Sequence, residues 1–407
     1  MNRRHFLTSL GSGAISFTQG QAAPTDTAAG LQEKLEALRQ KHRVPALAAA
    51  RVRVDGLAIQ TVTGFRKAGG TTPVTPDDLW HYGSLTKAMT ATLLATYVQE
   101  GRLQWDDPLG KLIPESCRKA HPRTKDITVL QLLQHRSGLR ANLLSWWILP
   151  RADQRGEILR LAAPPGADPP AAGSYLYSNV GYAIAGHIAE KLDNQPWEAL
   201  LEKRVFQPLK ITAGQGPVGT EGKDDQPWPH DEKGTALPAN GPASDNPPSL
   251  GPAGRVHASL ENYARFAADH LRGAAGQPAL LKPALYQILH GPDPVSHYAC
   301  GWGIADRPWA AGRCLTHTGS NNANFSAVWL APEKAFGVFA TCNQGGPAAA
   351  EACDAAWAAL AARLFLLLRQ RPDRHVEHVV EHAHRHLGHL DERRLVETGV
   401  LLERIAH

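Results

Sequence analysis

The spacing of apolar positions divides the chain into two sheet-forming regions with a helical region between them. Near the start, residues 47–54 and 57–63 are apolar-rich runs on either side of Asp55-Gly56. Asp-Gly favours the positive backbone angles of a two-residue hairpin turn. The pattern therefore predicts a β-hairpin.

Between residues 84 and 209 the apolar positions recur at helical spacing, with Pro and Gly as interruptions. One stretch opens at Ser84 and stops at Gly101, which predicts a helix with Ser84 in its first turn. A second helix is predicted from near Asn179 through Leu192. This part of the chain is expected to be mainly helical.

Sheet-forming runs return at residues 298–305, 314–318, 325–330 and 337–343, and a helix is predicted over 347–368. A hairpin at one end of the chain and strands at the other predict one antiparallel sheet built from both chain ends. The expected fold class is α/β of the α+β type, with helices flanking this sheet and a second, mainly helical lobe.

The expected boundaries are a sheet lobe at 31–80 and 255–370, a helical lobe at 81–212 and a long loop at 213–254. The loop segment holds eight Pro and eight Gly in 42 positions with almost no apolar run. Loops of this length in compact domains are usually functional or disordered. We expect this loop, together with Trp146 and Trp147, to contribute to substrate selection.

Three short strings in a fixed order supply candidate chemistry: Ser84-Leu85-Thr86-Lys87, Tyr177-Ser178-Asn179 and His317-Thr318-Gly319. They provide a nucleophile, two candidate bases and an element that can bind an anion. Acyl transfer through a serine ester requires such a set. Because residues three apart lie on one helical face, the Lys87 ammonium can reach the Ser84 hydroxyl.

A second Ser-x-x-Lys string, Ser116-Cys117-Arg118-Lys119, follows Pro114 and precedes His121-Pro122 in turn-like sequence. A motif match is a hypothesis that only its structural context confirms. We interpret this string as structural and Ser84 as the nucleophile.

With these strings the sequence resembles the penicillin-recognising serine hydrolases, which include class C β-lactamases, D-alanyl-D-alanine peptidases and related esterases. The three strings match the Ser-x-x-Lys, Tyr-x-Asn and Lys/His-Thr-Gly elements of that family. Further stretches similar to family landmarks are Asp77-Asp78, Gly101-Arg102-Leu103, Asp106-Asp107-Pro108, Leu132 to Leu139, Pro252-Ala253-Gly254, Gly301-Trp302-Gly303 and His317 to Asn343. The resemblance covers roughly residues 31–365 and is specific as a set.

The resemblance implies an active site in the cleft between the lobes, acting without metal or organic cofactor. Ser84 would attack, and the backbone amides of Ser84 and Ser320 would stabilise the oxyanion. Lys87 and Tyr177 are alternative or cooperating bases, and Lys87 would need a pKa lowered by burial or by a neighbouring cation. Asn179 would hydrogen-bond to Lys87 and to the substrate amide. The substrate-binding residues implied are Asn179, His317, Thr318, Gly319 and Ser320.

His317 stands where many β-lactamases have lysine. Because histidine titrates close to neutrality, strong carboxylate recognition is not expected from it. Arg255 follows Ala253-Gly254, where relatives often have glycine, and is a candidate replacement cation. The alternative is a solvent-facing arginine at the end of a loop.

Ester, D-amino-acid peptide and β-lactam substrates all require the same attacking machinery. We expect a small-molecule substrate, with a general esterase first, a D-alanyl-D-alanine carboxypeptidase second and a β-lactamase third. A slowly acylating penicillin-binding sensor without turnover is a non-catalytic alternative.

Charge and hydropathy exclude some partners. A net charge of +5 over 407 residues is modest, and no basic run is interleaved with aromatics, so nucleic acid is not expected. No segment approaches the roughly 18 continuous apolar residues that span a bilayer.

The five cysteines leave at least one unpaired, and an oxidising compartment would permit a disulfide between Cys300 and Cys314 or between Cys342 and Cys353. Oligomeric state stays open.

Residues 1–23 resemble a twin-arginine export signal. Arg3-Arg4 precedes a short, mildly apolar stretch and a small-residue exit at Gln21-Ala22-Ala23. The alternative is a frayed cytosolic tail with a chance arginine pair. We expect export to the bacterial periplasm or beyond, with cleavage near Ala22 or Ala23.

Residues 371–407 form a charged, His-rich tail, for which a helix is expected. Within it His378-Val379-Val380-Glu381-His382 matches the H-x-x-E-H motif of inverted zinc proteases. Only 25 residues follow His382, too few for the catalytic domain that such enzymes build around the motif. We interpret the motif as part of an amphipathic helix.

Overall fold

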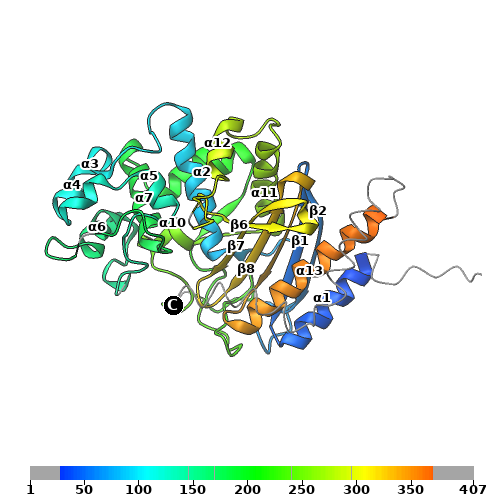
Figure 1. Cartoon of the computed structure of the whole chain (residues 1–407). Coiled ribbons are helices and arrows are strands. Elements are labelled where there is room, and N and C mark those ends of the chain that lie inside the picture. Colours follow the sequence, from blue (N-terminus) through cyan, green and yellow to red (C-terminus); the bar gives the residue numbers. More distant parts are fainter. Residues whose placement is uncertain (1–27, 145, 169, 240, 295, 370–407) are drawn as a thin grey trace, which may run out of the picture.

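The computed structural model describes residues 28–144, 146–168, 170–239, 241–294 and 296–369. At its centre is a six-stranded antiparallel sheet in the order β2-β1-β9-β8-β7-β6 (Figure 1). The strands are β1 (Ala46–Arg53), β2 (Gly56–Gly64), β6 (Gly303–Arg307), β7 (Gly312–Ser320), β8 (Phe325–Ala331) and β9 (Phe336–Cys342). The predicted sheet built from both chain ends is therefore confirmed, and with it the fold class.

The predicted hairpin is formed by β1 and β2, but its two-residue turn is Val54-Asp55 and not Asp55-Gly56, and Gly56, at a φ of +118°, is the first residue of β2 and pairs with Arg53. The register of the pair shifts between Arg51 and Val52. Strand β1 also pairs with β9, so the first strand of the chain lies in the middle of the sheet. The strand predicted from residue 298 begins only at Gly303, because Gly301, at a φ of +84°, turns the chain first.

Both faces of the sheet are buried. In β1, Ala46, Ala48 and Val52 pack into one hydrophobic cluster, whereas Leu47 and Ala49 pack into a second cluster on the opposite face. Successive side chains of a strand point to opposite faces, so a strand covered on both sides reads as a continuous apolar run. Helices α1 (Ala28–His42) and α13 (Pro347–Arg369) cover one face side by side, and α11 (Leu260–Ala274) covers the other (Figure 1).

The region after the hairpin is mainly helical, as predicted. Helix α2 (Thr86–Gln99) ends before Gly101, whose φ is +72°. The remaining α-helices are α3 (Leu109–Leu112), α4 (Pro114–Arg118), α5 (Val129–Leu133), α6 (Ile158–Ala162), α7 (Asn179–Asp193), α8 (Trp197–Leu201), α9 (Gln207–Leu209), α10 (Gly251–Gly254) and α12 (Pro283–Leu289). Helix α7 has the position predicted for the helix that begins near Asn179.

The segment 213–254 is more ordered than a long loop. It contains β4 (Ala213–Gln215) and α10, and β4 joins β3 (Trp80–His81) and β5 (Val256–Ala258) in a small sheet ordered β3-β5-β4. The side chain of His230 is buried, and its backbone amide donates to the Ala323 carbonyl at 3.1 Å. Strands of two or three residues leave no recognisable apolar period, which is why the prediction missed them.

Several sequence predictions concern residues outside the described ranges, namely the export signal, the His-rich tail and its H-x-x-E-H motif. The lobe boundaries likewise stay predictions. All five cysteines are buried free thiols, so neither of the two disulfides considered is formed. None of the described helices has the length and apolar character needed to cross a membrane.

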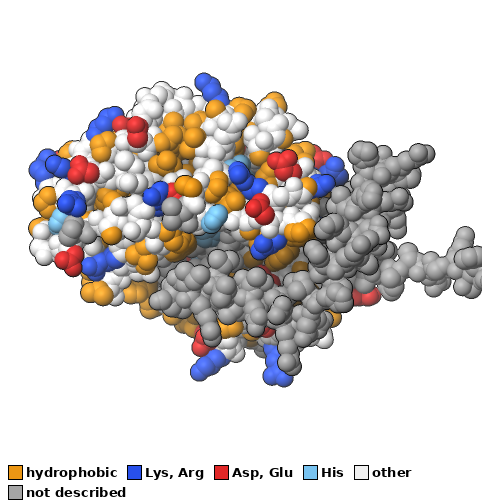
Figure 2. Space-filling model, in the orientation of Figure 1, with side chains coloured by type: hydrophobic (Ala, Val, Ile, Leu, Met, Phe, Trp, Pro, Cys, Tyr) orange, Lys and Arg blue, Asp and Glu red, His pale blue; other side chains and the backbone are white. Residues whose placement is uncertain are grey.

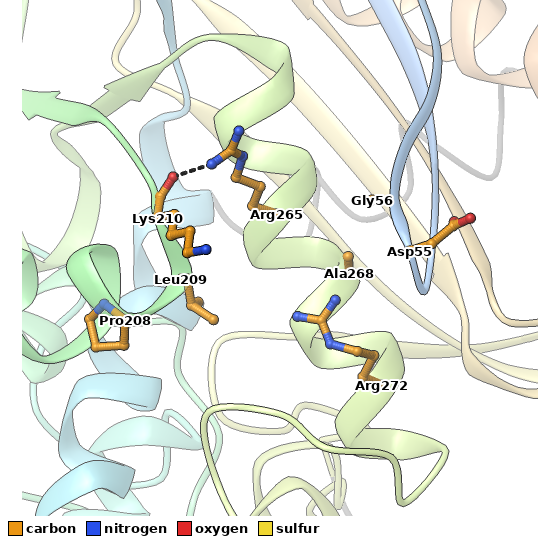
Figure 3. Close-up of a pocket in the computed structure, with 8 residues that line it drawn as sticks. All are labelled: Asp55, Gly56, Pro208, Leu209, Lys210, Arg265, Ala268 and Arg272. Carbon is orange, nitrogen blue, oxygen red and sulfur yellow. Dashed lines mark hydrogen bonds between the residues drawn. The ribbon is translucent and has the colours of Figure 1, made fainter.

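Basic and acidic side chains are interspersed on the face shown in Figure 2. A surface pocket of about 420 Å³ lies between the β1–β2 turn, α9 and α11 (Figure 3). Its two arginines have protein partners: Arg265 Nη1 donates to the Lys210 carbonyl at 2.5 Å, and Arg272 Nη1 donates to the Val54 carbonyl at 2.8 Å. No residue of the three strings lines this pocket.

Candidate active site

Ser84 lies in a single 3₁₀ turn, Gly83–Leu85, which leads directly into α2. One helical turn later, Lys87 Nζ donates hydrogen bonds to Ser84 Oγ at 2.8 Å and to the Ala253 carbonyl at 2.8 Å. Ser84 is partly exposed, whereas the Lys87 side chain is fully buried. The predicted proximity of the two side chains is thus present in the structure.

Burial lowers the pKa of the Lys87 amine well below its usual value, because the charged form loses its hydration. In the described part of the chain Lys87 has no carboxylate partner that would restore the charge. The amine is therefore suited to accept a proton from Ser84 near neutral pH.

Tyr177 precedes α7, and its ring centroid lies 4.9 Å from Lys87 Nζ. Burial raises the pKa of the phenol, although its contact with the Ser84 hydroxyl acts in the opposite direction. The phenol consequently keeps its proton at neutral pH, so it is suited to deliver a proton. Burial thus shifts the pKa values of the two candidate bases in opposite directions, and this favours Lys87 as the base.

Asn179 is the first residue of α7, after the N-cap Ser178. Its Nδ2 donates to Asn142 Oδ1 at 2.9 Å, and its backbone amide donates to the Ala141 carbonyl at 2.9 Å. The expected hydrogen bond from Asn179 to Lys87 is absent among the described residues. The Ala253 carbonyl takes that place on the lysine, so this expectation was wrong for the structure without substrate.

The His317-Thr318-Gly319 string lies on β7, where burial alternates: His317 and Gly319 are buried, and Thr318 is exposed. His317 Nε2 lies 2.9 Å from the Tyr298 hydroxyl, and Nδ1 lies 2.5 Å from the Thr318 carbonyl. Burial and the nearby Lys87 lower the pKa of His317 to about 3. The expectation that His317 titrates near neutrality was therefore wrong, since the ring is uncharged at neutral pH.

The serine turn and the end of β7 meet at two glycines. A Cβ atom on Gly83 would lie 2.4 Å from the Ser320 nitrogen, and one on Gly319 would lie 3.0 Å from the Ser84 nitrogen. The Cβ atom on Gly319 would also lie 2.0 Å from the Tyr82 carbonyl oxygen, so neither position can carry a side chain without moving the backbone. The backbone amides of Ser84 and Ser320, expected to stabilise the oxyanion, are thereby brought side by side.

Arg255 is neither a free cation nor a solvent-facing residue. Its Nε donates to Asp245 Oδ2 at 2.9 Å, and its side chain is only 12% exposed. A substrate carboxylate would have to compete with a buried counter-ion that is already in place. The proposed role of Arg255 in carboxylate recognition is not supported by this geometry.

The second Ser-x-x-Lys string is structural, as interpreted, although it lies mostly on α4 and not in a turn. Ser116 Oγ donates to the Gly156 carbonyl at 3.1 Å, and Lys119 Nζ pairs with Glu157 on the surface. Its serine and lysine thus have separate partners.

His135 belongs to a stretch that resembles a family landmark, yet the sequence assigned it no role. Its Nδ1 accepts a hydrogen bond from the Ser178 amide at 2.9 Å, and its carbonyl accepts one from the Leu176 amide at 2.9 Å. The two bonds flank Tyr177, whose ring centroid lies 4.3 Å from the His135 ring. His135 thereby holds the backbone on both sides of Tyr177.

Comparison with known proteins agrees with this geometry. A family model described as Beta-lactamase matches residues 31–363. The chain belongs to the β-lactamase family. That model spans the sheet, the helical region and all three strings.

Two curated relatives illustrate the range of the family. Penicillin-binding protein 4 of Amycolatopsis lactamdurans is 29% identical over 343 residues, which is 78% of this chain and 85% of the relative. The D-alanyl-D-alanine-carboxypeptidase/endopeptidase AmpH of Escherichia coli strain K12 is 28% identical over 38% of this chain and 43% of its own length.

Solved structures share the fold. A class C β-lactamase from Rhodobacter sphaeroides superposes with a TM-score of 0.66 at 19% identity, covering 82% of this chain and 99% of that structure. The structure of SurE superposes with a TM-score of 0.66 at 24% identity, covering 84% and 75% of the two chains. At these identities the likeness concerns the fold alone.

The Lys87→Met variant tests the role of the buried amine, because methionine has a similar length but accepts no proton. We expect phosphonylation of Ser84 by a fluorophosphonate to slow by about 10²- to 10⁴-fold, the usual contribution of a general base. For the unmodified protein, the rate should rise with pH to a midpoint below the ordinary lysine pKa of about 10.4. A methionine variant with the original rate would show that Lys87 is not the base.

His135→Asn and His135→Phe form a matched pair. The Asn Oδ1 atom can replace Nδ1 as acceptor of the Ser178 amide, and Asn tolerates the positive φ of +58° at this position. We expect the Phe variant to lose about tenfold or more in kcat, because Tyr177 is no longer held in place, and the Asn variant to stay within about threefold. Equal losses in both variants, at equal melting temperatures, would contradict this role.

Proposed function

We propose that the protein is a serine hydrolase that cleaves ester substrates through an acyl-enzyme on Ser84. The observation that carries this proposal is the 2.8 Å hydrogen bond between Ser84 Oγ and the buried Lys87 amine. A serine hydroxyl is a weak nucleophile unless an adjacent base removes its proton. A lysine that burial keeps uncharged is such a base.

In the first half of the reaction, Ser84 Oγ attacks the ester carbonyl carbon while its proton moves to Lys87 Nζ. The amides of Ser84 and Ser320 stabilise the negative charge that develops on the carbonyl oxygen, each contributing about 3 kcal/mol. The carbon–oxygen bond to the leaving group then breaks. Tyr177 donates the proton that the departing alkoxide needs, and it regains a proton from Lys87.

In the second half, a water molecule attacks the acyl-enzyme and transfers a proton to the Lys87 amine, which gave up its proton to Tyr177 in the first half. The second tetrahedral intermediate uses the same two amides. Its collapse releases the acid and returns a proton to Ser84 Oγ. All proton transfers therefore use groups that this chain supplies.

Exposed apolar side chains around Tyr177 favour a substrate with an apolar group. We define the rim as five exposed side chains of the helical lobe: Leu144, Trp147, Ile148, Tyr175 and Leu176. Two of them immediately precede Tyr177. Trp146, the neighbour of the rim residue Trp147, donates through its indole to Asn142 Oδ1 at 3.3 Å, and Asn179 Nδ2 donates to the same atom at 2.9 Å. We propose that the rim holds the apolar acyl group of the ester.

A peptide bond next to a D-residue is the second candidate substrate. It is favoured by AmpH, named as a D-alanyl-D-alanine-carboxypeptidase/endopeptidase, and by a SurE structure described with D-Leu. An apolar D-residue would suit the same rim. A β-lactam is the third candidate, with the Escherichia coli β-lactamase at 25% identity over 62% of this chain.

Parallel assays of p-nitrophenyl butyrate, a D-alanyl dipeptide and a cephalosporin rank the three substrate classes. We expect the ester to be hydrolysed fastest with repeated turnover, and Ser84→Ala to abolish hydrolysis of all three. Mass spectrometry of the trapped protein should place the acyl group on Ser84. A modification elsewhere, or full activity in Ser84→Ala, would overturn the proposal, whereas an adduct without turnover would indicate a penicillin-binding sensor.

A series of p-nitrophenyl esters from acetate to octanoate tests the rim. Burying each additional methylene contributes up to about 0.8 kcal/mol, so kcat/KM should rise by up to about fourfold per carbon. Trp147→Ala and Leu176→Ala should flatten this rise while leaving acetate hydrolysis nearly unchanged. Ile288→Ala removes an exposed apolar residue on α12, outside the rim, and is the matched control. An unchanged slope in the rim variants would exclude the rim as the acyl site.

We also propose export by the twin-arginine route, supported by Arg3-Arg4 and the stretch that follows it. This route carries folded proteins, and five buried free thiols are compatible with folding in a reducing compartment.

A further inference from the structure

We propose that Asp245 is a positioning residue whose carboxylate, acting through His81 and Asn321, holds the two backbone segments that carry the Ser84 and Ser320 amides. The inference rests on the proposed function, in which these amides stabilise the oxyanion. Asp245 belongs to the segment 213–254, so this segment would form part of the catalytic machinery itself.

The Asp245 carboxylate is buried, with 2% of its side chain exposed, and it has three side-chain partners. His81 Nε2 lies 3.0 Å from Oδ1, Asn321 Nδ2 donates to Oδ1 at 3.1 Å, and Arg255 Nε donates to Oδ2 at 2.9 Å. Burial alone would raise the pKa of this carboxyl, but His81 and Arg255 outweigh it and lower the pKa. Asp245 is therefore an ionised acceptor at neutral pH.

We call Asp245 and its partners the Asp245 network. Its first arm runs through His81 to the backbone next to Ser84. His81 Nδ1 accepts a hydrogen bond from the Gly83 amide at 3.1 Å, and Nε2, the other ring nitrogen, faces Asp245. Asp245 holds the imidazole through this 3.0 Å electrostatic contact, which lacks the geometry of a hydrogen bond, and the imidazole holds the Gly83 amide directly before the nucleophile.

The second arm leads to Ser320. Asn321 is the next residue along the chain, and its Nδ2 also donates to the Ser244 carbonyl at 3.1 Å. Its Oδ1 accepts hydrogen bonds from the Ala323 amide and from Asn324 Nδ2, each at 3.2 Å. The amide side chain is therefore fully engaged, and it ties the end of β7 to Asp245.

The two arms converge because Gly83 and Ser320 are in backbone contact. A displacement of either segment by a few tenths of an ångström would change the separation of the two amides. Oxyanion stabilisation depends on donors held about 2.7–3.1 Å from the developing charge. One buried carboxylate bonded to both segments is therefore placed to set that separation.

The test is a double-mutant cycle with Asp245→Asn, His81→Asn and the double variant, assayed on p-nitrophenyl butyrate. Asparagine at position 81 keeps an acceptor for the Gly83 amide but loses contact with Asp245. We expect each single variant to lower kcat by about 10- to 100-fold, with KM within about threefold, because the amides act mainly in the transition state. The double variant should be no worse than the poorer single variant.

A second readout separates positioning from stability. A trifluoromethyl ketone forms an oxyanion adduct with Ser84, and its affinity should fall in parallel with kcat in each variant. Asp225→Asn, which alters an exposed carboxylate of the same segment, is the matched control and should change neither quantity. Should Asp245→Asn fail to fold, His81→Asn and Asn321→Ala test the two arms separately, and each should weaken ketone binding.

Additive losses in the cycle, or a change in KM alone, would overturn the inference. So would unchanged ketone affinity in variants that still fold. Activity that survives Ser84→Ala would instead overturn the proposed function, so the two failures are distinguishable.

Discussion

The burial of the Lys87 amine beside Ser84 is the constraint on which the rest of the site depends. An ammonium group without water or a carboxylate partner is costly, and the neutral amine is the form that the protein interior favours. Helix α2 achieves this burial because every residue from Thr86 to Tyr97 is buried. Here the enclosure of the helix on all sides lowers the pKa of Lys87, so that the amine can act as a base.

Burial also favours the uncharged form of the neighbouring groups. It raises the pKa of Tyr177 and lowers that of His317, so both side chains are neutral at neutral pH. Burial therefore disfavours the charged form of the amine, the phenol and the imidazole at the centre of the site. Such a site gives little electrostatic attraction to a substrate carboxylate, and the apolar rim next to Tyr177 is consistent with that. Family membership leaves the substrate open, and these features favour a neutral ester.

The second constraint is the close contact between the serine turn and β7. Gly83 and Gly319 let two backbones approach to distances that any side chain would prevent. The position of these backbones is then secured by polar side chains that no catalytic motif contains, namely His81, Asp245 and Asn321. His135 has the corresponding position around Tyr177. In the proposed mechanism, the geometry of the site thus depends both on the motif residues and on buried polar side chains from distant parts of the chain.

The sequence by itself determined the hairpin, the serine helix, the sheet built from both chain ends and the three catalytic strings. These follow from local information, since apolar periodicity, a turn dipeptide and residues three apart on a helix need only neighbouring positions. The prediction that Ser116 is structural also depended only on local context.

Tertiary structure decided the charge states and the partners. The neutral His317, the pairing of Arg255 with Asp245, the bond from Asn179 to Asn142 and the small sheet of β3, β5 and β4 all depend on contacts beyond neighbouring positions. No local pattern reports burial by distant segments, and burial is what moves each pKa and selects each hydrogen-bond partner. The sequence could therefore identify the candidate reacting groups. Only the folded chain could set their protonation states and hold the Ser84 and Ser320 amides in place.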